Sequence, residues 1–190
     1  RSRRASRCLV AGDAARLPFR NDSVGSILTN SVLEHIAGLD GVLPEMYRVL
    51  RPGGKLVATV PTEAYARSTL GSRALQALGL TGLASLYRRT FNRVFRHWHD
   101  DALPVWEERM RRAGFTIVAV RPYLSRRVSA CEGLMYPSAL VAWLGKRLLG
   151  RYILWPRLRR LTARLFSSPL RELYLSPAER GGYVLLEMVK

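Results

Sequence analysis

The feature that most constrains the fold is an alternation of short apolar runs with segments of helical spacing. Runs typical of buried strands lie at 8–11, 24–30, 55–60, 115–120 and 182–189. Apolar side chains recur every three or four residues over 39–50, and a further helix is predicted over 101–113. Strands that alternate with helices predict an α/β fold with mostly parallel strands.

Turn residues set the expected boundaries of the first long helix. Asp40 is its candidate N-cap, although Pro44 is tolerated only in a first turn and leaves the start open. The tetrapeptide at 51–54, Arg-Pro-Gly-Gly, is predicted to end the helix, because Gly supplies a left-handed cap and Pro prevents continuation. We therefore expect a strand from 55 that stops at Pro61.

Composition narrows the class of protein. The chain has 190 residues, a formal net charge of +17 and 48% hydrophobic residues, which are too many for a disordered basic tail. The longest charge-free stretch, 133–145, is shorter than the roughly 18 residues of a membrane span. Two cysteines cannot form a disulfide framework or a four-cysteine zinc site. With no secretory signal recognised, we expect one domain over 1–190 in a reducing cytoplasm.

Polar residues follow the first two predicted strands. Asp13 and Ala14 come after the run at 8–11, and Asn30 ends the run at 24–30. Ligands of open parallel sheets bind at the carboxyl ends of strands. A carboxylate there can accept from the exocyclic amine of adenine while the next backbone N–H donates to a ring nitrogen. The alternative is that Asp13 only caps its own turn.

Four motifs carry a resemblance to a known family. They are GDAARLPF at 12–19, NDSV at 21–24, VLEH at 32–35 and RVLRPGG at 48–54, with Ala-Gly-Phe at 113–115 fitting as well. In this order they resemble class I S-adenosylmethionine-dependent methyltransferases, and more narrowly the branch that includes the ubiquinone and menaquinone biosynthesis enzymes. The segments 62–96 and 122–180 match no motif of that family. The resemblance implies a Rossmann-like sheet and S-adenosyl-L-methionine as cofactor.

The resemblance also implies roles for single residues. Asp13 corresponds to the residue that reads adenine, Ala14 to its backbone-contacting neighbour, and Asn30 lies near the methionine part of the cofactor. His35 is the candidate general base if the acceptor must lose a proton, with His97 and His99 as weaker candidates and local hydrogen bonding as the alternative role. Some relatives bind a divalent metal through an acidic residue and a Glu-His pair. Ser31 replaces the first carboxylate before Glu34 and His35, so no metal is predicted.

Two features of the family are absent from the sequence: its glycine-rich cofactor loop and its ribose-binding carboxylate. The family strand order is 3-2-1-4-5-7-6, and the run at 8–11 would be strand 3. We therefore expect an incomplete sheet that lacks the first two βα units, roughly 50–80 residues. Such a chain should bind the cofactor weakly or not at all. Its strand at 24–30 should have an unpaired apolar edge or a non-native neighbour.

Two segments outside the motifs are predicted to be helical. Residues 62–96 are interpreted as a lid or cap, and 122–180 as a helical insert before the last strand. Within the insert, 139–171 combines basic side chains with Trp, Leu and Tyr at helical spacing. This pattern favours contact with an anionic membrane surface. A cap on the core with a solvated basic rim remains the alternative, and nucleic acid is the less favoured partner.

Together these inferences predict methyl transfer to a small or lipid-like acceptor, by a cytoplasmic protein that can be peripheral to the inner membrane face. The alternative is a non-catalytic basic module that binds membrane or nucleic acid on a methyltransferase-like fold. The identity of the acceptor and the methylated atom cannot be inferred from the sequence.

Overall fold

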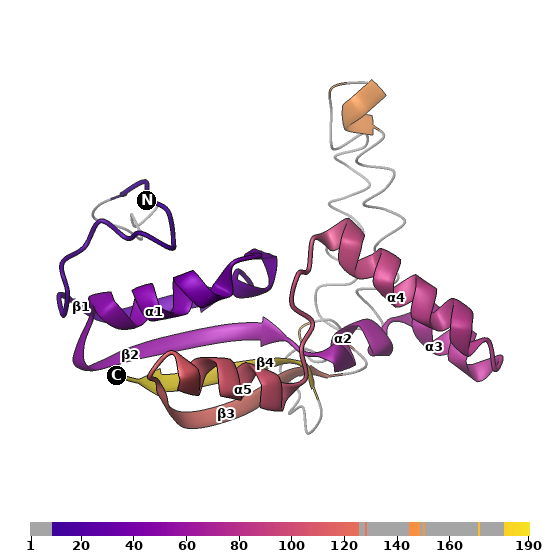
Figure 1. Ribbon diagram of the computed structural model, residues 1–190. Helices are drawn as coiled ribbons and strands as arrows, with labels where there is room; N and C mark the ends of the chain where they lie inside the picture. Colours follow the sequence, from indigo (N-terminus) through magenta and orange to yellow (C-terminus); the bar gives the residue numbers. More distant parts are fainter. Residues whose placement is uncertain (1–8, 126–127, 129–144, 149, 151–170, 172–180) are drawn as a thin grey trace.

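The computed structural model describes residues 9–125, 128, 145–148, 150, 171 and 181–190. In chain order its named elements are β1 (Val24–Asn30), η1 (Leu33–His35), α1 (Leu39–Val49), β2 (Leu50–Pro61), α2 (Glu63–Ser68), α3 (Leu70–Ala77), α4 (Thr81–Phe95), α5 (Leu103–Arg112), β3 (Thr116–Ser125) and β4 (Gly181–Val189). Figure 1 shows α1 and α5 beside a sheet, with α2, α3 and α4 extending to one side. We call residues 62–96, which contain these three helices, the helical arm.

The strands form a four-stranded sheet in the order β1-β2-β4-β3. With β1 as strand 4, this order agrees with the 4-5-7-6 half of the family sheet. Among the described strands, β1 and β2 pair in parallel, whereas β4 pairs antiparallel with both β2 and β3. Three of the four described strands, β1, β2 and β3, therefore run in the same direction, which confirms the prediction of mostly parallel strands. β4 inserts between β2 and β3 and runs opposite to both.

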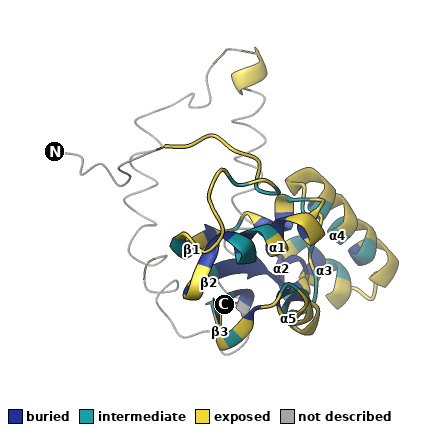
Figure 2. Cartoon of the chain, turned by 60° about the vertical axis from the view of Figure 1, so that its left-hand side comes forward, coloured by how far each residue is buried: buried dark blue, intermediate teal, exposed yellow. Residues whose placement is uncertain are grey.

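One face of the sheet carries the hydrophobic core. In β2 the alternate residues Leu56, Ala58 and Val60 are fully buried, as expected for a strand with one face on a core. Helices α1 and α5 close this core and contribute Leu39, Val42, Leu43, Met46, Trp106 and Met110. Figure 2 shows the same buried layer between the sheet and these helices. The indole of Trp106 is fully buried and donates from Nε1 to the Pro61 carbonyl oxygen over 3.0 Å.

β1 forms an edge of this sheet, as predicted. Its Leu28 side chain is 74% exposed, and no described strand pairs with its outer side. The strand predicted at 8–11 is wrong for the residues that can be described, because Leu9, Val10 and Ala11 are exposed and belong to no strand. A strand persists only when its backbone groups find a partner, and none of the described strands lies beside this segment.

Several boundaries differ from the predicted ones. Helix α1 begins after Gly38, and Asp40 lies in its first turn rather than at the N-cap. The helix ends at Val49, and the Arg-Pro-Gly-Gly tetrapeptide at 51–54 belongs to β2 instead of terminating the helix. There it forms a bulge, because Val24 pairs with Leu50 but Ser26 pairs with Lys55. Gly53 has a positive φ of 71°, as predicted for a left-handed glycine, but it lies in the bulge of β2 and not at the end of a helix.

The helical arm confirms the helices predicted for 62–96. It is attached to the sheet at its base, where the Thr62 amide donates to the Gly182 carbonyl oxygen over 2.9 Å. Tyr65, Ala66, Phe91 and Tyr183 form a small buried cluster there. Further out, α3 and α4 expose much of their surface, visible as the yellow helices of Figure 2. The assignment of the arm as a lid or cap remains a prediction.

The helical insert predicted for 122–180 lies mostly outside the described residues, including nearly all of 139–171. Its first residues belong to β3, which runs to Ser125 and so extends past the predicted end at 120. Within the described part of the chain, no helix is both long enough and apolar enough to cross a membrane.

Candidate functional site

The ends of β1 and β2 are joined by side-chain hydrogen bonds. The Thr59 hydroxyl donates to Oδ1 of Asn30 over 2.6 Å, and the Ser31 amide donates to Thr59 Oγ1 over 3.0 Å. Ser31 has a φ of 50°, so the chain turns sharply as it leaves β1. Asn30 is exposed and its carboxamide is oriented by Thr59. Asn30 ends β1, at the edge of the sheet where ligands of such folds bind.

Asp13 forms a tight turn. Its Oδ1 accepts a hydrogen bond from the Ala15 amide over 2.9 Å, and its carbonyl accepts one from Arg16 over 2.9 Å. The capping role left open by the sequence is thus present. Capping uses one carboxylate oxygen only. Asp13 is exposed and Ala14 half-buried, and the Ala14 amide donates to no acceptor among the described residues.

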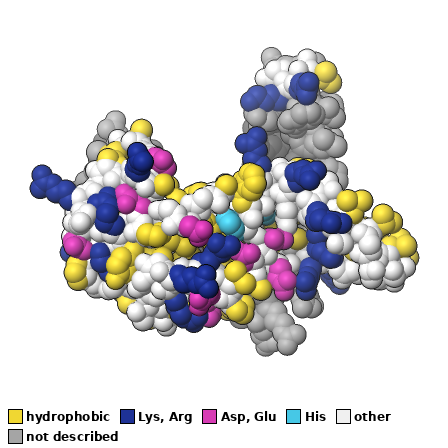
Figure 3. Space-filling model, in the orientation of Figure 1, with side chains coloured by type: hydrophobic (Ala, Val, Ile, Leu, Met, Phe, Trp, Pro, Cys, Tyr) yellow, Lys and Arg dark blue, Asp and Glu magenta, His cyan; other side chains and the backbone are white. Residues whose placement is uncertain are grey.

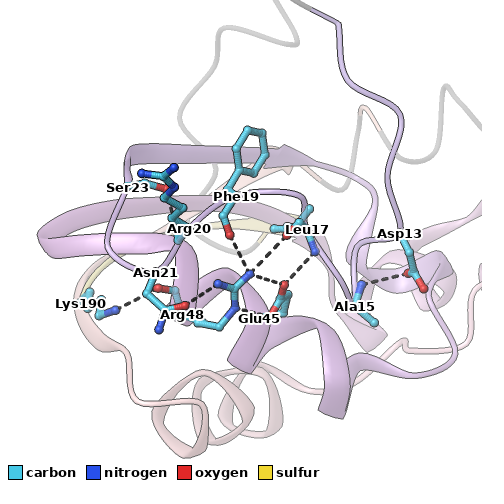
Figure 4. Close-up of polar contacts among 10 residues, drawn as sticks. All are labelled: Asp13, Ala15, Leu17, Phe19, Arg20, Asn21, Ser23, Glu45, Arg48 and Lys190. Atoms are coloured by element: carbon cyan, nitrogen blue, oxygen red, sulfur yellow. Dashed lines mark hydrogen bonds and ion pairs between the residues drawn. The ribbon is translucent and has the colours of Figure 1, made fainter.

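An arginine clamp fixes the segment that follows this turn (Figure 4). Arg48 of α1 donates to both carboxylate oxygens of Glu45, over 2.8 and 2.7 Å, to Asn21 Oδ1 over 2.5 Å and to the Phe19 carbonyl over 3.0 Å. The Leu17 amide donates to Glu45 Oε1 over 2.7 Å. The hydrogen bonds from Arg48 lower the pKa of the Glu45 carboxyl from 4.5 to about 2.

The clamp also places the Asp13 turn. The segment runs along α1, and a Cβ added to Gly41 in the first turn of that helix would lie 3.7 Å from Ala15 Cβ. This is the end of α1 that follows η1 and the carboxyl end of β1. Asp13 and Asn30 therefore lie toward the same edge, although no hydrogen bond or ion pair between described residues joins Asp13 to Asn30 or His35.

His35 ends η1, directly beyond this edge. Its Nδ1 lies 3.1 Å from the Arg96 carbonyl oxygen, which can only accept, so Nδ1 carries the proton. Nε2 of the neutral ring is then an acceptor, and it lies 3.9 Å from Glu34 Oε1. The side chain is 42% exposed. The local hydrogen bond that the sequence left open as an alternative role of His35 is therefore present. It uses Nδ1, fixes the orientation of the ring and leaves Nε2 without a hydrogen bond to a described residue.

Glu34 is fully buried beside His35. Neither of its carboxylate oxygens has a hydrogen-bond partner, which is costly for a charged group. Burial raises the pKa of the Glu34 carboxyl above its usual value, although the residue's own backbone N–H and the nearby His35 partly oppose the effect. The Glu34 carbonyl oxygen accepts hydrogen bonds from the amides of Trp98 and His99, over 2.8 and 3.3 Å. These bonds dock the segment after α4 on η1.

Docking brings His97 next to His35. The ring centroids are 5.0 Å apart, and the Nδ1 atom of His97 is buried without a partner. Burial lowers the pKa of the His97 imidazole, His35 lowers it further, and Asp100 opposes the shift. One carboxylate oxygen of Glu34 and one nitrogen from each of the two histidines all lie within 4.8 Å of one another. We call the sheet with the helices α1 and α5 that pack on it the sheet body. Figure 3 shows histidine side chains at the junction of the sheet body and the helical arm.

Aromatic side chains from the arm and the sheet surround His97. Its ring centroid lies 6.3 Å from that of Phe91 and 6.4 Å from that of Tyr65. Tyr65 also packs edge-on against Tyr183 of β4, at 4.9 Å. An apolar, aromatic environment therefore adjoins the polar Glu34 and the two histidines.

The structure brings together two candidate residues that the sequence alone could not pair. His35 meets His97, a weaker candidate 62 positions later, and no spacing rule would have paired them. Thr59, the partner of Asn30, was missed because a threonine at the end of a strand carries no distinctive signal. His99 is turned away from the group, with its Nε2 3.0 Å from the Ile36 carbonyl oxygen.

Sequence comparisons agree with the motifs. Residues 1–58 match the family model described as a methyltransferase domain. The demethylmenaquinone methyltransferase of Streptomyces avermitilis is 31% identical over 121 residues, covering 60% of this chain and 51% of that protein. The corresponding protein of Mycobacterium marinum is 33% identical over 126 residues, covering 60% and 52%. In sequence the chain is thus similar to a methyltransferase domain and to demethylmenaquinone methyltransferases. It spans about half the length of the curated relatives it matches.

Solved structures share the fold of this chain. A SAM-dependent methyltransferase of Thermotoga maritima superposes with a TM-score of 0.52 at 16% identity, covering 94% of this chain and 62% of that one. The [4+2]-cyclase SpnF gives a TM-score of 0.53 at 18% identity, covering 95% and 56%. The expected Rossmann-like α/β fold is confirmed. A cyclase among the similar structures also shows that this fold alone does not determine the reaction.

Proposed function

We propose that the protein containing this chain transfers a methyl group from S-adenosylmethionine to a small, lipid-like acceptor of the quinone type. The observation that carries the proposal is the arrangement of Asn30, Thr59 and His35 at the carboxyl edge of the two parallel strands, in a chain whose motifs match demethylmenaquinone methyltransferases. Ligands of this fold class bind at that edge. The whole protein's activity is the subject of the proposal, since the matched relatives are about twice as long.

The residues present fit the adenine end of the donor. The turn at Asp13 offers a carboxylate oxygen beyond the one used in capping, and the neighbouring Ala14 amide has no acceptor among the described residues. These two groups would hold the adenine edge, and the Asn30 amide would donate to the methionine part. The sulfonium of the donor supplies an activated methyl group, so the chain's own task is to position the acceptor and exclude water.

His35 is proposed to accept the proton of an acceptor hydroxyl or carbon acid. Its tautomer supports this role, because Nδ1–H donates to the Arg96 carbonyl and leaves Nε2 free to take a proton. The buried aromatic side chains of Tyr65, Phe91 and Tyr183 make the surroundings of His97 apolar. This environment supports a quinone-like acceptor better than a charged one.

Donor binding tests the adenine-end assignment. In the longest polypeptide that the gene encodes, Asp13→Ala should weaken S-adenosylhomocysteine binding by about 1–3 kcal/mol, because a buried amine loses its acceptor. Asp13→Asn is the matched control, since it keeps an acceptor oxygen and the turn. Calorimetric titration measures both. An affinity unchanged in Asp13→Ala would remove Asp13 from the site.

Turnover tests the reaction. Radiolabelled methyl transfer from S-adenosylmethionine to a demethylated naphthoquinol should be detected, and His35→Ala should lower kcat. If the donor binds and no acceptor is methylated, the non-catalytic binding module becomes the better description. If the donor does not bind the full polypeptide, the methyltransferase proposal fails.

We propose in addition that the protein meets anionic membranes through 139–171. That segment holds eight basic residues between 146 and 171 without an acidic one. The described arm supports the idea, because Leu83, Leu86 and Val94 are 52, 53 and 69% exposed on one face of α4, next to Arg89 and Arg93. Figure 3 shows hydrophobic and basic side chains together along the arm. A peripheral site of this kind would bring the chain to lipid-dissolved acceptors.

Vesicle co-sedimentation tests the membrane proposal. The chain should sediment with phosphatidylglycerol vesicles and less with phosphatidylcholine vesicles, and high salt should release it. Leu83→Ser combined with Val94→Ser should weaken binding, whereas Val118→Ser, at a 63% exposed apolar position on β3, should not. No binding to anionic vesicles at low salt would reject the proposal.

A further inference from the structure

The group formed by Glu34, His35 and His97 has a feature that methyl transfer does not explain. Glu34 is completely buried, yet both of its carboxylate oxygens lack a hydrogen-bond partner and Oε1 has only His35 Nε2 at 3.9 Å. The Nδ1 atom of His97 is buried without a hydrogen-bond partner as well. Buried polar atoms in folded proteins nearly always have a hydrogen-bond partner or a bound ion. Glu34 and His97 therefore bring unsatisfied buried polar atoms into one group with His35, and such a group indicates a missing positive charge.

The tautomer of His35 strengthens this conclusion. Because its Nδ1 donates to the Arg96 carbonyl, its Nε2 presents a lone pair toward Glu34 Oε1 at 3.9 Å. Two acceptors facing each other need a proton or a cation between them. Donation from the second ring nitrogen to a backbone carbonyl is also the usual outer contact of a metal-bound histidine, since it fixes the ring and raises its basicity.

We propose that Glu34, His35 and His97 form a binding site for a divalent transition-metal ion of the zinc type. The ligand atoms lie within 4.8 Å of one another, whereas ligands about 2.1 Å from a tetrahedral ion lie roughly 3.4 Å apart. Two imidazoles and a carboxylate favour zinc, cobalt or nickel over magnesium, which prefers oxygen ligands.

This site differs from the one that the sequence suggested and discounted. There the third position was Ser31, which lies before η1. Here it is His97, which directly follows the helical arm and comes from a distant part of the chain. A bound ion would therefore link the arm to η1. Three protein ligands leave a coordination position open for water or an acceptor oxygen. In that state Nε2 of His35 is a ligand, and the ion rather than the free imidazole faces the acceptor.

Metal titration of the untagged chain tests the proposal without donor or acceptor, so its outcome is independent of the methyltransferase assignment. Both cysteines are first replaced by serine, because thiolates are the competing soft ligands. Zn²⁺ should bind with 1:1 stoichiometry in competition with a chromophoric chelator, excess Mg²⁺ should not displace it, and Co²⁺ should give the visible absorption of a four- or five-coordinate site.

Ligand variants decide the assignment. His35→Ala, His97→Ala and Glu34→Gln should each weaken Zn²⁺ binding by more than the roughly 10–100-fold that loss of an outer contact costs. His99→Ala is the matched control, because His99 contacts the Ile36 carbonyl instead, and it should bind normally. Circular dichroism verifies folding, and the exposed His35 provides a variant that leaves the core intact. Absent stoichiometric binding, or binding that survives both histidine substitutions, would overturn the proposal.

Discussion

The sheet body and the helical arm differ in how they are held. The body has a continuous apolar core in which Leu56, Val60 and Trp106 are fully buried between the sheet, α1 and α5. The arm buries only a few side chains, such as Ala84 and Phe91 of α4. Its attachment depends on the aromatic cluster at its base and on two amides that donate to the Glu34 carbonyl.

This difference indicates a division of roles. Buried apolar area provides most of the folding free energy, so the body should set global stability. Segments with few buried contacts open at lower free energy, which makes them the usual source of movement near ligands. The candidate site lies between the two regions, with Glu34 and His35 on the body and His97 at the end of the arm.

Removing the largest core side chain should have the greatest effect. Trp106→Ala should lower the free energy of unfolding by about 3–5 kcal/mol, because it leaves a cavity and an unpaired Pro61 carbonyl. Urea unfolding followed by circular dichroism measures this loss. Trp98→Ala, at a 66% exposed indole, should change stability by about 0.5 kcal/mol or less. Equal losses in the two variants would contradict the assignment of the core to the body.

A change within the arm should have a smaller, local effect. A Cβ on Gly71 of α3 would lie 2.7 Å from the Tyr87 ring of α4, so Gly71→Ala should separate the two helices at a cost of about 1–2 kcal/mol after the gain in helix propensity. Amide hydrogen exchange should then accelerate in 63–95 and not in β2. Gly82→Ala is the control, because nothing lies within 4 Å of its added Cβ. Faster exchange in β2 as well would show that arm and body unfold together.

The smallest expected effect concerns the clamp on α1 and depends on pH. The folded pKa of Glu45 is about 2, below the ordinary value of 4.5. A depressed folded pKa stabilises the fold above the unfolded pKa, and this stabilisation is lost as pH falls from 4.5 toward 2. The difference in urea midpoint between the parent chain and Glu45→Gln should therefore be present at pH 6 and disappear near pH 2. A constant difference over this range would exclude ionisation as its source.

Periodicity predicted the body better than the arm or the site. The strand at 24–30 and the helix over 101–113 were found almost to the residue, because their apolar faces meet one core. The run at 8–11 looked equally strand-like and failed, since strand formation also requires a neighbour that the sequence pattern does not reveal. The bulge at 51–54 was misassigned because glycine and proline mark a turn without saying in which element it lies.

The site was predictable only where one short motif supplies it. Asp13, Asn30 and His35 follow strand ends, so the resemblance could select them, and the turn at Asp13 was anticipated as an alternative. The contact between His35 and His97 arises from tertiary packing of the arm, which no local pattern encodes. The burial of Glu34 was hidden for the same reason, because charged residues are rarely expected in a core.

The outer side of β1, which no described strand covers, has a practical consequence for handling the chain. Its outer backbone amides and carbonyls and the solvent-facing Leu28 offer a ready template to any other extended polypeptide. Concentrated solutions should therefore form intermolecular sheets through this strand, and a lysine in place of Leu28 should keep the molecules apart.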